Sequence, residues 1–136
     1  MIQQLISDPA VLKQVSQPAT TADWPVATDL LETLQAHGDN CIGLAAIMIG
    51  IPKRIIAVTL GPVNVPMLNP RLVKKLQPYQ ATEECLCLPG KKTTTRYKQI
   101  TVAFQTPQGE EQRLSLSGIA AEAVQHELDH CNGILI

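Results

Sequence analysis

Residues 126–130 read His-Glu-Leu-Asp-His, an instance of the pattern H-E-x-x-H. On a helix, residues four apart lie on one face, so His126 and His130 can direct two imidazoles at one metal ion. Glu127 lies one step around the helix, close enough to act as a general base on a water at that metal. These five residues therefore predict metal-assisted hydrolysis.

The sequence around this motif is typical of a helix interior. Residues 119–131 read IAAEAVQHELDHC, a stretch rich in alanine and free of glycine and proline. Asn132 and Gly133 follow and predict the helix end, with Gly133 in a left-handed cap. The alternative is a solvated helix that carries the pattern by chance, but two of the three histidines of the chain lie in it. Since buried His and Glu are costly without partners, we expect a mostly buried helix with a metal site.

A catalytic zinc-type site takes three protein ligands and keeps one position open. The motif supplies two, and few residues follow it, so we expect the third ligand upstream. The best donors are Cys85 and Cys87, which alternate with leucines and would share one face of an extended segment. Either thiolate could bind on this reasoning alone. His37, by contrast, is expected in the last turn of a helix over 21–37, where it favours the helix dipole.

Three segments together resemble the peptide deformylase family. Residues 83–87 read EECLC where the family has EGCLS, and residues 125–130 read QHELDH where the family has QHExDH. Residues 41–50 read CIGLAAIMIG where the family has GxGLAAxQxG. The segments occur in family order, and the resemblance covers nearly the whole chain. It implies small antiparallel or mixed sheets wrapped around a central HELDH helix.

The resemblance also implies residue roles when it is carried over by position. Cys85, His126 and His130 would be the metal ligands, and Glu127 the general base and acid. The backbone N–H of Leu86 would help to hold the developing oxyanion. One divalent ion is implied, Fe(II) in many members, although a thiolate and two imidazoles also suit zinc, nickel or cobalt. The implied reaction releases formate from N-formylmethionyl peptides or nascent chains.

The methionine side chain of such a substrate needs an apolar pocket. For each wall candidate the alternative is an ordinary place in the core, because apolar residues near a motif more often fill the interior than line a site. The candidates are Ile42, Gly43, Leu44, Met48, Leu88 and Val124.

Three departures from the family pattern bear on the chemistry of the site. Met48 replaces the Gln that assists the oxyanion; a thioether offers no donor, and losing one such donor typically costs about 10²–10³ in turnover. Met48 could also simply fill a gap in the pocket wall or reshape the pocket. Glu84 replaces Gly and is expected to face away from Cys85 into solvent, although in the cleft it would raise the pKa of Glu127. Cys87 replaces Ser and is either a small buried hydrophobe or a further ligand.

Segregated helices and antiparallel-looking strands predict an α+β fold. At 136 residues we expect a single domain over 1–136. A hairpin turn is predicted at 107–109. The expected strands cover 55–60, 67–69, 85–88, 100–104 and 112–116.

Composition narrows the classes of partner. A formal net charge of −1 gives no general attraction to nucleic acid or to anionic membranes. The lysine pairs at 74–75 and 91–92 are expected to be solvated, with proximity to the ribosome as the alternative. No stretch reaches the ~20 apolar residues of a membrane span, and a signal peptide is not expected. Four cysteines with a thiolate ligand among them favour reduced thiols and a cytoplasmic location.

Three functions compete at this stage. The first is a peptide deformylase, with activity weakened by Met48 and Glu84. The second is a deformylase-like protein that keeps the fold and the metal but has lost or altered its activity, and that binds formyl peptides or inhibitors or hydrolyses another small acyl amide. The third is a purely structural metal site, which is disfavoured because structural sites usually close with four ligands, although Cys87 could make the fourth. Nothing in the sequence indicates the oligomeric state.

Overall fold

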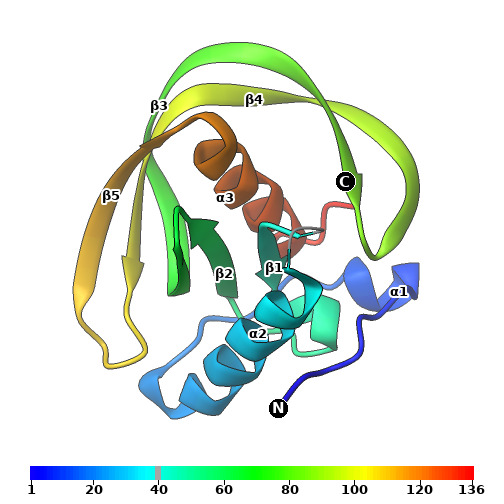
Figure 1. The fold of residues 1–136 in the computed structure, drawn as a ribbon, viewed down its shortest axis with the longest axis vertical. Coiled ribbons are helices and arrows are strands. Elements are labelled where there is room, and N and C mark those ends of the chain that lie inside the picture. Colours follow the sequence, from blue (N-terminus) through cyan, green and yellow to red (C-terminus); the bar gives the residue numbers. More distant parts are fainter. Residues whose placement is uncertain (39–40) are drawn as a thin grey trace.

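The computed structural model describes residues 1–38 and 41–136. Helices and an antiparallel sheet build the fold, so the prediction of an α+β protein is confirmed (Figure 1). The helical elements are α1 (Pro9–Leu12), η1 (Thr21–Asp23), α2 (Trp24–His37), η3 (Ala46–Ile49) and α3 (Gly118–Cys131). The strands are β1 (Gly43–Ala45), β2 (Ile55–Leu60), β3 (Val63–Cys85), β4 (Leu88–Gln105) and β5 (Glu111–Ser117).

The strands form one sheet in the order β1-β2-β3-β4-β5, and each strand pairs antiparallel with the next. Short connections are sufficient for this meander because antiparallel neighbours need only a turn. The predicted turn at 107–109 is present, and the Thr106 N–H donates to the Glu110 carbonyl at 2.8 Å to close it. β2 and β5 lie where strands were expected.

β3 and β4 are much longer than the sequence predicted. The expected strands at 67–69 and 100–104 are only one end of this hairpin, and the expected strand over 85–88 is wrong, because Cys85 pairs with Leu88 across a turn. The two strands curve together over α3 (Figure 1). Register shifts along the hairpin explain this bend, since a bulge adds twist and curvature to a strand pair.

The helix that carries HELDH is central and buried, as predicted. α3 contacts β1, β2 and β4, and nine of its residues are buried. Asn132 caps its C-terminus, and Gly133 follows in the left-handed region at φ 74°. A Cβ at Gly133 would lie 2.3 Å from the Lys13 carbonyl oxygen, so the chain passes too closely here for any side chain.

The second long helix, α2, packs against β2 and β3 through Leu30 and Leu34, which are 0% and 1% exposed. Pro25 lies in its first turn, and Gly38 ends it, as expected. His37 lies in the last turn of α2 and is not one of the donors that converge on α3. In the described part of the chain, no helix has the length and apolar character needed to cross a membrane.

Candidate active site

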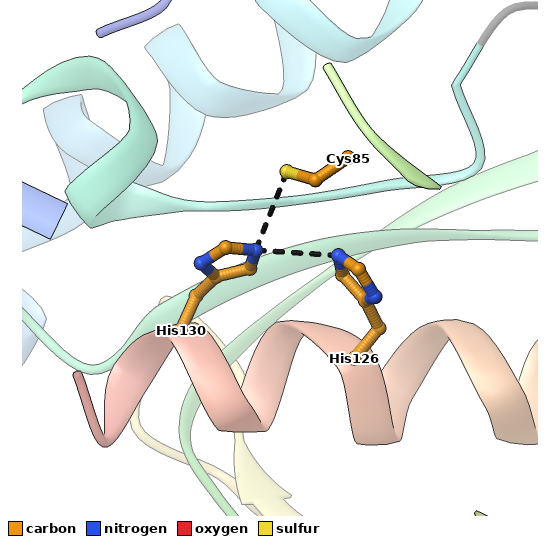
Figure 2. A group of neighbouring side chains, drawn as sticks. All are labelled: Cys85, His126 and His130. Carbon is orange, nitrogen blue, oxygen red and sulfur yellow. Dashed lines mark hydrogen bonds between the residues drawn. The ribbon is translucent and has the colours of Figure 1, made fainter. Parts of the chain in front are cut away.

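Two elements bring Cys85, His126 and His130 together (Figure 2). Cys85 ends β3, and the two histidines lie one turn apart on α3, with their rings directed toward the same side as the sulfur. The two Nε2 atoms are 3.2 Å apart, and Cys85 Sγ is 3.4 Å from His130 Nε2. All three donor atoms lie within 4.8 Å of one another.

These separations fit a bound divalent ion. Bonds of about 2.0–2.1 Å to nitrogen and about 2.3 Å to sulfur at tetrahedral angles place two nitrogens about 3.3 Å apart, and nitrogen and sulfur about 3.6 Å apart. The observed 3.2 Å between the two Nε2 atoms and 3.4 Å between Cys85 Sγ and His130 Nε2 are close to these values. A cation between the three atoms would also satisfy two imidazole nitrogens that otherwise face each other.

Glu83 orients one of these ligands, although the sequence interpretation gave it no role. It lies two residues before Cys85 on β3, so both side chains point to the same side of the strand. His126 Nδ1 donates to Glu83 Oε1 at 2.8 Å, which leaves His126 Nε2 free for a metal. Burial alone would raise the pKa of Glu83, but hydrogen bonds with His126 and Arg96 lower that pKa to about 2.

Arg96 joins the strand pair to the helix. Its guanidinium donates to both carboxylate oxygens of Glu83, at 2.7 and 2.9 Å, and to Asp129 Oδ2 at 2.8 Å. Arg96 and Glu83 are only 3% and 7% exposed. Removing one member of such a buried pair leaves the other charge without compensation. This contact also gives Asp129, the fourth residue of HELDH, a structural role.

Neighbouring groups shift the pKa values of His126 and Cys85. Burial lowers the pKa of His126, but hydrogen bonds with Cys85 and Glu83 outweigh burial and raise the pKa to about 10 without a bound ion. A hydrogen bond from Cys87 is the largest of the effects that lower the pKa of the Cys85 thiol. The site therefore holds a thiolate ready to bind a cation, and His126 must release a proton on binding.

Glu127, the expected general base, is a buried carboxyl group on α3. It is 4% exposed, and its Oε1 has no hydrogen-bond partner among the described residues. The other oxygen lies against Gly43, where an added Cβ would come within 3.0 Å of Oε2. Burial raises the pKa of Glu127 to about 7, although His126 and His130 act to lower it. A base with a pKa near neutrality is well matched to proton transfer.

A cavity of about 300 Å³ opens beside these groups. Ile42 and Leu86 are 41% and 47% exposed and form an apolar part of its wall. Leu86 lies in the turn between β3 and β4, next to Cys85. Of the expected wall residues, Ile42, Gly43 and Met48 line this cavity, together with the ligands Cys85 and His126 and the base Glu127.

Leu44, Leu88 and Val124 do not line the cavity. Leu44 follows Gly43 on β1, so its side chain points to the opposite face, where it is 0% exposed. Val124 is also 0% exposed in the core, and Leu88 packs against the edge of that core. Polar residues line the cavity as well, namely Thr82, Glu84 and Glu122.

Comparison with known proteins gives the family. Residues 2–136 match the family model described as Polypeptide deformylase. The chain belongs to the peptide deformylase family. A peptide deformylase of Clostridium beijerinckii is 42% identical over 136 residues, which cover 100% of both chains. A peptide deformylase of Rhizobium meliloti is 39% identical, and the match covers 96% of this chain and 79% of that protein.

Solved peptide deformylase structures share the fold. The peptide deformylase from Thermotoga maritima superposes with a TM-score of 0.88 at 30% identity, covering 99% of this chain and 95% of that chain. A class I type b peptide deformylase from Acinetobacter baumannii with Met-Ala-Ser bound gives 0.88 at 27% identity, covering 99% and 97%. Like its family, this deformylase is a metal-dependent hydrolase.

The departures from the deformylase pattern now have places in the structure. Met48 is 2% exposed on η3, and its Sδ accepts the Ala45 N–H at 3.4 Å. The side chain of Glu84 points away from that of Glu83 and is 66% exposed, and its Oε1 lies 3.7 Å from Lys91 Nζ. Glu84 is therefore solvated, as expected from the sequence. It also contributes to the lining of the cavity.

Cys87 is buried beneath the hairpin turn and is not one of the three converging donors. Its backbone N–H donates to Cys85 Sγ at 3.5 Å. Burial and the hydrogen bond with Cys85 both raise the pKa of the Cys87 thiol, so Cys87 stays protonated while Cys85 ionises. A structural site closed by Cys87 therefore receives no support from the described residues.

Proposed function

We propose that this deformylase removes the formyl group from N-formylmethionyl peptides, with Cys85, His126 and His130 holding one divalent ion and Glu127 as general base and acid. The convergence of one thiol and two imidazoles beside an unpartnered buried carboxylate carries this proposal. From the family resemblance we infer Fe(II) as the natural ion, and the same donors suit zinc, nickel or cobalt. Proximity to the ribosome stays a prediction.

When bound, the cation polarises the formyl carbonyl and lowers the pKa of an adjacent water. Glu127 takes a proton from this water and then gives it to the nitrogen of the leaving amine. Glu127 lines the cavity, and its Oε1, which has no hydrogen-bond partner among the described residues, is available to accept that proton. The Leu86 N–H at the hairpin turn donates to the oxygen on which negative charge develops. Formate and a free amino terminus are the products.

We further propose that Met48 slows this reaction. The sulfur is an acceptor already engaged by the Ala45 N–H, so it cannot donate to the developing oxyanion. One missing donor typically costs about 10²–10³ in turnover. Met48 is also the observation that favours the second candidate function, a deformylase-like protein that binds formyl peptides without turning them over.

The test is formate release from formyl-Met-Ala-Ser by anaerobically purified, Fe(II)-loaded protein. Glu127→Gln should abolish release with the metal content unchanged, whereas Glu110→Gln, an exposed control in the β4–β5 turn, should have no effect. Met48→Gln should raise turnover by about 10². A silent parent that Met48→Gln rescues would favour the second candidate, and release that survives Glu127→Gln would contradict the proposal.

A further inference from the structure

Several acidic side chains line the cavity, although the sequence predicted an apolar pocket. Four glutamates line the cavity, and among its described lining residues there is no lysine or arginine. Two of the four are accounted for, because Glu83 is paired with Arg96 and Glu127 is the general base. Glu84 is exposed and paired with Lys91. Glu122 is left as the cavity-lining carboxyl group that forms no salt bridge among the described residues.

Glu122 reaches the cavity because of its position on α3. It lies one turn before His126, so the two side chains share a helix face, about 6 Å apart along the axis. Its Oε1 accepts a long hydrogen bond of 3.4 Å from the Tyr79 hydroxyl. No salt bridge to Glu122 is found within the described ranges. Burial, a hydrogen bond with Glu83 and the negative charge of Glu83 raise the pKa of Glu122, although Tyr79 and Arg96 act to lower it. A further positive charge beside Glu122 would therefore be favourable.

A second observation shows that this cavity takes a polar ligand. Glu127 lines the same cavity, is 96% buried on the same helix, and has an oxygen without a partner in the part of the chain that the structure describes. A substrate whose amide is placed at Glu127 has its adjoining side chain within reach of Glu122, about one helical turn away. The long flexible stem of a lysine side chain can span this distance and place its ammonium group against the carboxylate.

We propose that Glu122 is a specificity-determining residue that favours formyl peptides whose formyl-bearing residue has a cationic side chain. This inference rests on the proposed deformylase function and adds a substrate class to it. Charge selects the cationic side chain over an aliphatic one of the same stem, while the apolar wall at Ile42 and Leu86 still accepts an uncharged chain. Thr82 adds a hydroxyl group to the lining of the cavity.

The test compares formyl-lysyl-Ala-Ser with formyl-norleucyl-Ala-Ser, since norleucine keeps the lysine stem without the ammonium group. The ratio of kcat/KM for the two peptides cancels differences in metal loading. Glu122→Gln removes the charge at nearly constant volume and should lower the lysyl-to-norleucyl ratio about tenfold. Glu84→Gln, the matched control, should leave the ratio within about twofold, because Glu84 is exposed and paired with Lys91 and an exposed pair contributes little.

Binding of the product peptides gives a readout that does not depend on turnover. Lys-Ala-Ser should bind the parent protein more tightly than norleucyl-Ala-Ser in calorimetry, and Glu122→Gln should remove this preference. A ratio that Glu122→Gln leaves unchanged, or that Glu84→Gln lowers equally, would overturn the inference. If neither formyl peptide releases formate, the proposed function fails, and the product-binding ratio then decides the role of Glu122 separately.

Discussion

The two adjacent glutamates at the end of β3 should respond very differently to the same substitution. Glu83 is 7% exposed and forms a bidentate pair with the buried Arg96, whereas the side chain of Glu84 is 66% exposed and 3.7 Å from Lys91. Glu83→Gln leaves the Arg96 guanidinium compensated only by Asp129. Breaking a buried pair typically costs about 3–5 kcal/mol, and an exposed pair about 0–1 kcal/mol.

We expect Glu83→Gln to lower the free energy of unfolding of the metal-free protein by about 3 kcal/mol, because glutamine keeps one acceptor for Arg96. Glu84→Gln should lower it by less than about 1 kcal/mol. Urea unfolding of metal-free protein measures both values. Using metal-free protein removes the separate loss of metal affinity, about 10–100-fold, that follows when a partner of a ligating histidine is removed.

The pH dependence gives this prediction a second measurement. The pKa of Glu83 is about 2 in the folded protein and 4.5 for an unperturbed glutamate, so the unfolded chain binds more protons between these values. The stabilisation by Glu83 is therefore complete above about pH 4.5 and is lost as pH falls toward about 2. Glu83→Gln should lose less stability across this window than the parent does. Equal losses in the Glu83 and Glu84 variants at neutral pH would refute the reasoning.

Three further predictions concern close contacts and protons. Gly43→Ala should lower kcat by about 10² in the formate assay, because a Cβ within 3.0 Å of Glu127 Oε2 displaces the base; unchanged kcat would contradict the placement of Glu127. Gly133→Ala should lower the free energy of unfolding by at least about 2 kcal/mol in urea, because its Cβ would meet the Lys13 carbonyl and φ is 74°. The apparent metal affinity should rise about tenfold per pH unit between about pH 6 and 9, because His126, with a pKa of about 10, must lose a proton to bind the metal. Competition with a chelator measures this affinity, and an affinity that does not change with pH would argue against His126 as a ligand.

The features that local sequence could predict are those of α3. The spacing of His126 and His130, the alanine-rich interior and Gly133 all act within one helix, so periodicity and capping were sufficient to find them. The sequence also predicted that the Glu84 side chain points to solvent, because the alternation of side chains along a strand is a local property. The third ligand was narrowed to two cysteines by the residues, and the family resemblance favoured Cys85, which the structure places beside both histidines.

The rest depended on contacts between distant segments. Residues 71–80 of β3 are mostly exposed and include Pro78, and their partner is β4 rather than the core, so they show no alternation from which a strand could be predicted. The contacts of Arg96 with Glu83 and Asp129 depend on the register of that hairpin and on its curvature over α3. The position of Glu122 follows from the same arrangement, which brings it to Tyr79 of β3.

The most direct test of the metal site measures the metal content and the X-ray absorption spectrum of the bound metal in protein purified without oxygen. We predict one divalent ion per chain with one sulfur and two imidazole nitrogens among its ligands, and a loss of the sulfur contribution in Cys85→Ser but not in Cys87→Ser. An ion with two sulfur ligands, an ion retained without change in Cys85→Ser, or protein that binds no ion would contradict the assignment of Cys85, His126 and His130.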